Sequence, residues 1–167
     1  LDRFRVTHRL STYTLDELKI LVKQSAKRLH LTIDDEAIES VAQRCRFNPR
    51  QANNLLMLSH DMSVVLNGNS DEAAVNLKVV NETLESLGID VKGLTPDDRQ
   101  LLKTIANTFS GGPVGVDSLA STTDLDKANI IENIEPVLLR YELITRGLKG
   151  RSITKLGLEH LILTGEG

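Results

Sequence analysis

The chain has 167 residues, of which 40% are hydrophobic and 26% are charged, and its formal net charge is −3. This length is enough for one domain or two small ones, and the composition is typical of soluble globular proteins. No apolar run reaches the roughly 18 residues that a membrane-spanning helix needs, and the first ten residues lack the apolar core of a signal peptide. Because the chain is slightly acidic, binding to nucleic acid would require a local basic patch.

The scarcity of aromatic residues, 3% of the chain with no tryptophan, favours cores of leucine, isoleucine, valine and alanine, and therefore helices. Cys45 is the single cysteine, so no intramolecular disulfide forms, in agreement with a reducing compartment. It lies in an apolar helical pattern and is interpreted as a small buried hydrophobic residue. The four histidines lie far apart without the spacing of metal ligands, so no metal site is expected.

The first half of the chain shows the helical period of apolar residues and little strand signal. Thr14 and Glu17 have the spacing of a capping box, and Asn48 followed by Pro49 is another strong helix start. The expected helices run from Thr14 to about residue 30, from after Thr32 to about residue 45, from Asn48 to the Asn-Gly-Asn sequence at 67–69, and from Asp71 to Leu87.

The second half begins with a further cap and proline at Thr95-Pro96 and changes period near its end. Expected helices cover 96–109, 117–121, 126–141 and 155–163, and Pro136 is expected to kink the third of these. The segments ELITR and RSIT, joined by the turn GLKG, predict a β-hairpin between the last two helices. Three helices followed by a hairpin are typical of a winged helix, a helix-turn-helix variant.

The hairpin is basic although the whole chain is acidic. From Arg140 to Lys155 the sequence holds five basic residues and a single acid, Glu142. Glycines at 147 and 150 would let the hairpin tip approach a phosphate backbone closely. A charged tip is also common in ordinary solvated turns, so the pattern alone leaves DNA contact and simple solvation both open.

Arg50 raises a question, because it directly follows the helix start at Asn48-Pro49. A positive charge in the first turn faces the positive end of the helix dipole, which is unfavourable unless an anion lies nearby. The four-helix unit resembles the lid subdomain of AAA+ ATPases, in which an arginine at this place, called sensor 2, reaches the phosphates of a bound nucleotide. A guanidinium suits this task because it grips phosphate oxygens with two N–H groups.

The resemblance extends over nearly the whole chain to the RuvB family of bacterial Holliday-junction branch-migration ATPases. Its most specific part is the block from Gly111 to Ala120, because this block is long and has no general AAA+ use. The matching motifs are Arg3-Phe4, Tyr13-Thr14, Asn48-Pro49-Arg50, Gly88-Ile89-Asp90, Gly111 to Ala120, Glu135-Pro136 and Gly150-Arg151. The fold implied is mainly α: a four-helix AAA+ lid at 1–88 and a winged-helix domain with a small β-hairpin at 89–167.

The resemblance implies a nucleotide-binding role for four residues of the lid half. Arg3 matches the arginine finger, which completes the ATP site of a neighbouring subunit in a ring and stabilises the transferred phosphoryl group. Tyr13 matches a residue that packs by the nucleotide base, although packing on the lid itself is a competing interpretation. Arg50 matches sensor 2, with Pro49 beside it.

On the winged-helix side the resemblance implies contact with DNA. Arg146 and Arg151 match arginines that face DNA, and Lys149 and Lys127 fall where the family is basic. Such phosphate contacts would be independent of sequence and sensitive to salt. The chain departs from the family at Phe47, where a glycine is usual.

The sequence contains no G-x-x-x-x-G-K-[ST] phosphate loop and no acidic Walker B strand. We therefore expect the C-terminal portion of a longer protein, inactive alone, whose parent uses ATP or ADP with Mg²⁺. The resemblance also implies a homohexameric ring, duplex DNA at Holliday junctions, a RuvA partner bound through the absent ATPase subdomain, and a location in the bacterial cytoplasm with no membrane contact.

Two other interpretations fit the same elements. The chain could be the lid and winged helix of another AAA+ protein, of the origin-recognition or loader type, that binds duplex DNA statically. Alternatively, the winged helix could serve protein contact only, with its basic hairpin solvated. Salt-sensitive DNA binding separates the last interpretation from the others.

Overall fold

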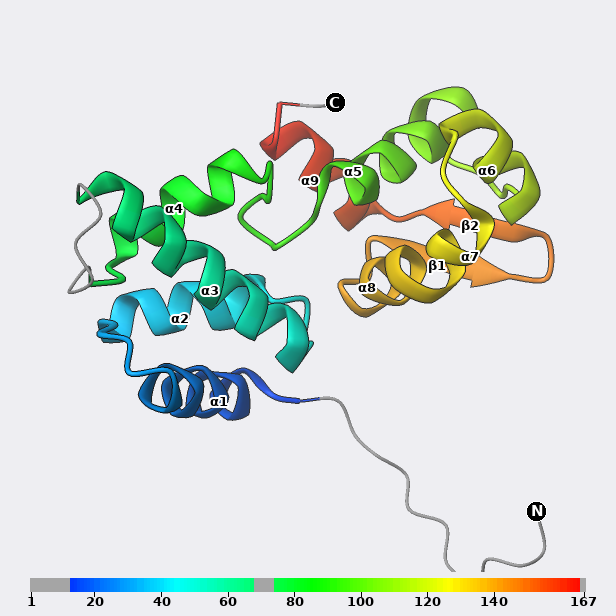
Figure 1. The fold of residues 1–167 in the computed structure, drawn as a ribbon. Helices are drawn as coiled ribbons and strands as arrows, with labels where there is room; N and C mark the ends of the chain where they lie inside the picture. The colour runs from blue at the N-terminus through cyan, green and yellow to red at the C-terminus, as the bar shows by residue number, and fades with distance from the viewer. Residues whose placement is uncertain (1–12, 68–73, 166–167) are drawn as a thin grey trace, which may run out of the picture. The chain divides into compact units, whose positions relative to one another are not determined.

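The computed structural model describes residues 13–67 and 74–165, and the chain divides after Glu85 into two compact units (Figure 1). The described residues are mainly helical and include one two-stranded antiparallel hairpin, as the sequence pattern predicts. No helix among them is long and apolar enough to cross a membrane. Nor do the described histidine, cysteine, aspartate and glutamate side chains gather into a group that could hold a metal ion.

The first unit corresponds to the predicted lid, and two of its helices begin at caps that the sequence predicts. The helices are α1 (Leu15–Arg28), α2 (Asp35–Arg44), α3 (Pro49–Leu66) and α4 (Leu77–Ser86). At α1 the capping box is confirmed: the Thr14 hydroxyl accepts from the Glu17 N–H at 3.3 Å, and the Glu17 carboxylate accepts from the Thr14 N–H at 2.7 Å. These hydrogen bonds lower the pKa of Glu17. At α2 and α3 the cap makes one such bond: the Asp34 side chain accepts from the Ala37 N–H, and the Asn48 side chain accepts from the Arg50 N–H.

The core of the lid unit consists of small and aliphatic side chains. Helix α1 packs against both α2 and α3. Fully buried residues include Leu18, Val22, Val41 and Leu56, which follow the helical period. Cys45 belongs to this core, as predicted, and burial raises the pKa of its thiol.

The fourth helix begins later than the expected start at Asp71. Residues 71–73 lie outside the described ranges, and α4 begins only at Leu77. Val75 instead forms an isolated parallel bridge with Ile33, and the Asn76 side chain accepts from the Val79 N–H at 3.0 Å. Asn76 therefore caps α4, and Val75 directly before it lies outside the helix.

The second unit has the element order of a winged helix. It contains α5 (Pro96–Lys103), the π-helical turn η1 (Thr104–Thr108), α6 (Val116–Thr123), α7 (Lys127–Asn129), the π-helical turn η2 (Ile130–Ile134), α8 (Glu135–Arg140), β1 (Ile144–Gly147), β2 (Gly150–Ile153) and α9 (Lys155–Leu163). The hairpin register places Arg146 opposite Arg151 and Gly147 opposite Gly150. The hairpin β1–β2 is called the wing below.

The helix expected over 126–141 is not uniform near Pro136. The run 127–140 is instead divided into α7, η2 and α8, with the π turn directly before the proline. Within this turn the Glu135 N–H donates to the Ile130 carbonyl, five residues earlier. Proline has no N–H to donate, so the helix loses one hydrogen bond just after the π turn gives way to α8.

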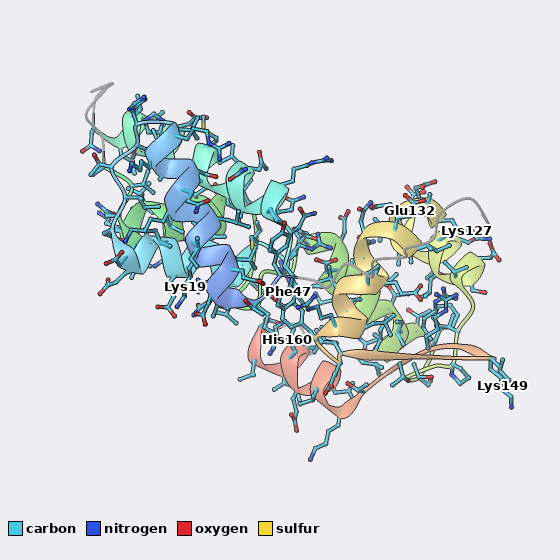
Figure 2. The ribbon with its side chains drawn as sticks, turned by 90° about the horizontal axis from the view of Figure 1, so that it is seen from below. Lys19, Phe47, Lys127, Glu132, Lys149 and His160 are labelled. Atoms are coloured by element: carbon cyan, nitrogen blue, oxygen red, sulfur yellow. The ribbon has the colours of Figure 1, made fainter. Side chains whose placement is uncertain are left out.

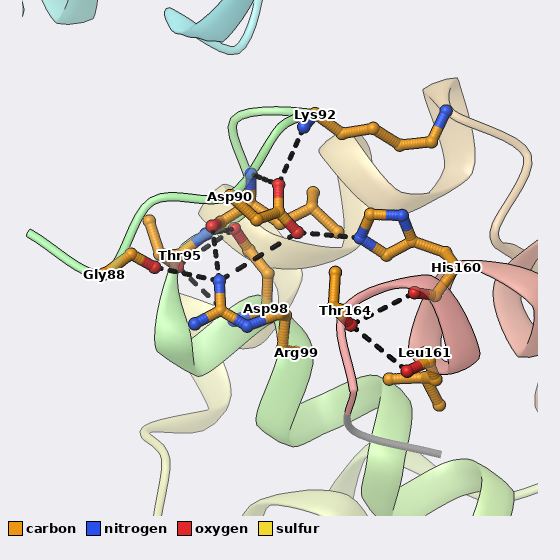
Figure 3. A network of polar contacts seen from close by, with 10 residues as sticks. Gly88, Asp90, Lys92, Thr95, Asp98, Arg99, His160, Leu161 and Thr164 are labelled. Carbon is orange, nitrogen blue, oxygen red and sulfur yellow. Dashed lines mark hydrogen bonds and ion pairs between the residues drawn. The ribbon is translucent and has the colours of Figure 1, made fainter. Parts of the chain in front are cut away.

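The core of the winged-helix unit is aliphatic, with a polar network at one side (Figure 3). The Asp90 carboxylate accepts from the backbone N–H groups of Lys92 and Leu94 at 2.8 and 2.9 Å. The same carboxylate lies 2.7 Å from Nε2 of His160, which is buried on α9. Arg99 donates to the Leu94 carbonyl at 2.9 Å. The network therefore ties the segment before α5 to α9.

Candidate nucleotide and DNA interfaces

The start of α3 combines a helix N-terminus with an exposed cation. Asn48 caps the helix by accepting from the Arg50 N–H at 2.9 Å, and Pro49 occupies the first helical position. The Arg50 side chain is exposed, and no hydrogen bond or ion pair links its guanidinium to another residue within 13–67 and 74–165. The first turn of α3 holds no acidic residue. Both the helix dipole and the guanidinium therefore favour an anion supplied from outside the lid.

The loop before α3 has an unusual backbone. Arg46 and Phe47 both have φ of 57°, the left-handed region in which a side chain costs about 1–2 kcal/mol per residue. Glycine adopts this conformation without that cost, which gives a physical reason for the glycine that the family resemblance implies at position 47. The Asn48 N–H donates to the Cys45 carbonyl at 3.0 Å, so the loop is a tight connection from α2 to the start of α3.

The other predicted nucleotide residues are less informative in the structure. Tyr13 is exposed and directly precedes the cap of α1, and Pro49 is half-buried. Arg3 lies outside the described residues. The roles of all three beside a nucleotide stay predictions.

Lys149 lies at the tip of the wing, in the two-residue turn between Gly147 and Gly150 (Figure 2). Its side chain is exposed and has no hydrogen-bond or ion-pair partner within the described part of the chain. The neighbouring Leu148 is also fully exposed. An unpartnered cation at an extended tip is suited to meeting an external phosphate.

The two predicted arginines of the wing share one carboxylate. Glu135, at the start of α8, accepts from Nε and Nη2 of Arg151 at 3.0 and 2.6 Å through its Oε2. Its other oxygen accepts from Nη1 of Arg146 at 2.9 Å. The exposed fractions of the side chains are 2% for Glu135, 10% for Arg151 and 57% for Arg146. Arg151 is therefore engaged inside the unit, whereas Arg146 keeps a face in solvent.

Backbone contacts hold Arg151 in place as well. Its N–H donates to the Val114 carbonyl at 2.8 Å, and the Val114 N–H donates to the Arg151 carbonyl at 2.9 Å. Gly150 allows this approach, because a Cβ on it would lie 2.2 Å from the Val114 oxygen, and its φ is 128°. The segment before α6 thus pairs with β2 through an isolated antiparallel bridge between Val114 and Arg151.

Lys127, at the start of α7, is paired within the unit. Its Nζ lies 2.5 Å from the Asp117 carboxylate on α6, and both side chains are largely exposed. The run 127–140 holds two bases, Lys127 at its start and Arg140 at its end, and two acids, Glu132 and Glu135. Of these acids Glu132 is exposed (Figure 2).

Glu135 is the residue that sequence reasoning missed, since it entered only as part of a Glu-Pro motif. The sequence did contain an indication of its role: Glu135 is an acid that lies between Ile134 and Leu138, two residues of the buried face. Buried acids almost always have a partner, so an acid on an apolar face indicates a basic residue elsewhere. The spacing does not say which one.

Comparison with known families divides the chain a few residues after the boundary between the two compact units. The model of the RuvB AAA lid domain matches residues 13–90, and that of the RuvB C-terminal winged helix domain matches residues 91–162. The chain belongs to the RuvB family. It carries the RuvB lid followed by the RuvB winged helix.

Named RuvB relatives agree with this assignment. The Holliday junction branch migration complex subunit RuvB of Prochlorococcus marinus is 34% identical over 163 residues, covering 98% of this chain and 45% of the relative. The same subunit of Kosmotoga olearia is 37% identical over 160 residues, covering 96% and 46%. The chain spans about half the length of these relatives.

A solved RuvB structure has the same fold. The Thermotoga maritima RuvB Holliday junction branch migration motor is similar with a TM-score of 0.88 and 35% sequence identity. The match covers 96% of this chain and 53% of that structure.

Proposed function

We propose that this chain is the nucleotide-sensing and DNA-contacting half of an ATP-dependent motor that migrates Holliday junctions during recombination and repair. The observation that carries the proposal is the exposed basic wing, with Arg146 on β1 and Lys149 at its tip, on a chain whose net charge is −3. The printed names of the relatives, which describe branch migration of Holliday junctions, support the choice of substrate.

In the lid, Arg50 acts as the nucleotide sensor. Its guanidinium has no internal partner in the described residues and stands at an N-terminus that favours anions. ATP with Mg²⁺, when bound by the ATPase subdomain of the parent protein, supplies the phosphoryl-transfer chemistry. Arg50 holds a phosphate oxygen, Pro49 shapes the helix start beside it, Tyr13 packs by the base, and Arg3 serves the ATP site of a neighbouring subunit in a hexameric ring.

In the winged helix, Lys149 and Arg146 contact the phosphate backbone of duplex DNA. Contacts of this kind do not depend on base sequence, as a motor that moves along any DNA requires. Lys127 and Arg151 are further predicted contacts, and each already pairs with a carboxylate of its own unit, Asp117 and Glu135 respectively. The parent works in the bacterial cytoplasm with RuvA as its partner.

Fluorescence anisotropy with labelled duplex and four-way junction DNA at two salt concentrations tests the proposal. We expect binding that weakens steeply with salt, and a Lys149→Ala variant whose plot of log affinity against log salt is shallower by about 1, the loss of one phosphate contact. Lys27→Ala, an exposed lysine on α1, changes the net charge equally and is the matched control. Absence of salt-sensitive binding, or equal effects of both variants, would favour a wing used for protein contact only.

A further inference from the structure

The ion-pair cluster of Glu135, Arg146 and Arg151 joins α8 to both strands of the wing. One nearly inaccessible carboxylate receives three N–H groups from two arginines that face each other across the hairpin. The cluster has two positive charges and one negative charge, so one positive charge remains in excess. That excess resides on Arg146, the only member with a largely exposed side chain.

The two arginines have different surroundings although they are register partners. Arg151 is fixed by its backbone bonds to Val114 and by two hydrogen bonds from its side chain to one Glu135 oxygen. Arg146 gives Glu135 a single N–H, from Nη1. A guanidinium has five N–H donors, so the remaining donors of Arg146 are available on its exposed face. Arg151 thus holds the carboxylate, and the carboxylate holds Arg146.

Orientation matters for a cation that binds DNA. A free arginine side chain samples many rotamers, and binding a phosphate must restrict them, which reduces affinity. A contact that already fixes one N–H group removes part of that loss. By fixing Arg146, Glu135 favours phosphate binding even though its own charge repels phosphate.

We propose that Glu135 is a positioning residue for DNA binding: it holds the guanidinium of Arg146 so that the outward N–H groups meet a backbone phosphate, while Arg151 keeps Glu135 in place from inside the wing. The inference rests on the proposed DNA contact of the wing and adds to it a division of roles between the two arginines. It makes Arg146 the contacting arginine and Arg151 its support.

The test replaces the buried pair without changing net charge. Glu135→Met with Arg151→Met exchanges a buried ion pair for apolar side chains of similar length, an exchange that often leaves stability unchanged. We expect this double variant to fold, as checked by circular dichroism, and to bind duplex DNA several-fold more weakly than the unmodified chain. We also expect a salt dependence as shallow as that of Arg146→Ala, because the same phosphate contact is lost.

A triple variant decides between the two arginines. If Glu135 acts through Arg146, adding Arg146→Ala to the double variant has little further effect on affinity, because the two changes are coupled. A full additional loss would overturn the inference and indicate direct contact by Arg151 or an independent Arg146. Unchanged binding by the double variant would also overturn it. Lack of salt-sensitive binding by the unmodified chain would instead defeat the proposed function itself.

A second variant covers the case in which the double variant does not fold. Glu135→Gln keeps the shape and one acceptor oxygen but loses the charge that holds two guanidinium groups. Relaxation of the side-chain Nε of Arg146, measured by nuclear magnetic resonance without DNA, should show an ordered group in the unmodified chain and a mobile one in this variant. An equally mobile Arg146 in both would contradict the positioning role.

Discussion

The candidate cation of the lid and those of the winged helix differ in what already surrounds them. Arg50 stands at the start of α3 with no anionic partner in the described residues, whereas Lys127, Arg146 and Arg151 are each paired with a carboxylate of their own unit. Only Lys149, among the four cations predicted to contact DNA, resembles Arg50 in this respect. Arg50 and Arg151 both lie in sequence motifs of the family. The exposed Arg50 is free to bind an external ligand, whereas the buried Arg151 stabilises its own unit.

Removing the Glu135 side chain should have the largest effect on stability. Glu135→Ala leaves the buried guanidinium of Arg151 without its anion, which we expect to lower the free energy of unfolding of the winged-helix unit by about 3–5 kcal/mol. Arg50→Ala should change that of the lid by less than about 0.5 kcal/mol, because the side chain is exposed. Urea unfolding of both variants measures the two changes in unfolding free energy. Similar changes for Glu135→Ala and Arg50→Ala would contradict the difference between the two sites.

Asp90 is a second buried polar residue, and its removal should lower the unfolding free energy by less than the removal of Glu135. Asp90→Ala deprives two backbone N–H groups and His160 of their acceptor, which should cost about 2–3 kcal/mol in the unfolding free energy. Asp61→Ala, at an exposed site on α3, serves as the control and should cost less than about 0.5 kcal/mol. Equal unfolding midpoints for the two variants would show that the network in Figure 3 contributes little.

His30 offers a small gain in the lid. After α1 it adopts φ of 57°, while the Leu31 N–H donates to the Ala26 carbonyl at 2.9 Å, an arrangement in which glycine is preferred. His30→Gly should raise the unfolding free energy of the lid by about 1 kcal/mol through relief of the left-handed conformation. His30→Ala retains a Cβ and should give no such gain, so thermal unfolding of the pair isolates the backbone effect.

Much of the fold was predictable because its signals are local. The caps at Thr14, Asn48 and Thr95 place helix starts correctly, and the last helix, α9, occupies the expected residues. The start of α4 was missed: Asn76 caps the helix there, and the pairing of the preceding Val75 with Ile33, far away in sequence, is not visible in the local pattern. The π turn before Pro136 was not predicted either, and a similar turn forms at η1 without a proline.

The candidate site was predictable only in part, for the same reason. Basic residues on a hairpin and an arginine after a proline cap are visible in the sequence. Which of these cations already has an anion is not visible, because Glu135 lies sixteen residues before Arg151 and meets it only through folding. The division between Arg146 and Arg151 therefore required the structure.

ATP turnover in a chimaera tests the role of the lid most directly. The chimaera joins the ATPase portion of Thermotoga maritima RuvB to this chain, and Arg28→Ala, an exposed arginine on α1, is its control variant. If the unpartnered guanidinium of Arg50 binds the phosphates during the reaction, Arg50→Ala lowers kcat by about tenfold or more, the equivalent of about 1.4 kcal/mol, without shifting the unfolding midpoint. Turnover equal to that of the Arg28→Ala chimaera would contradict it.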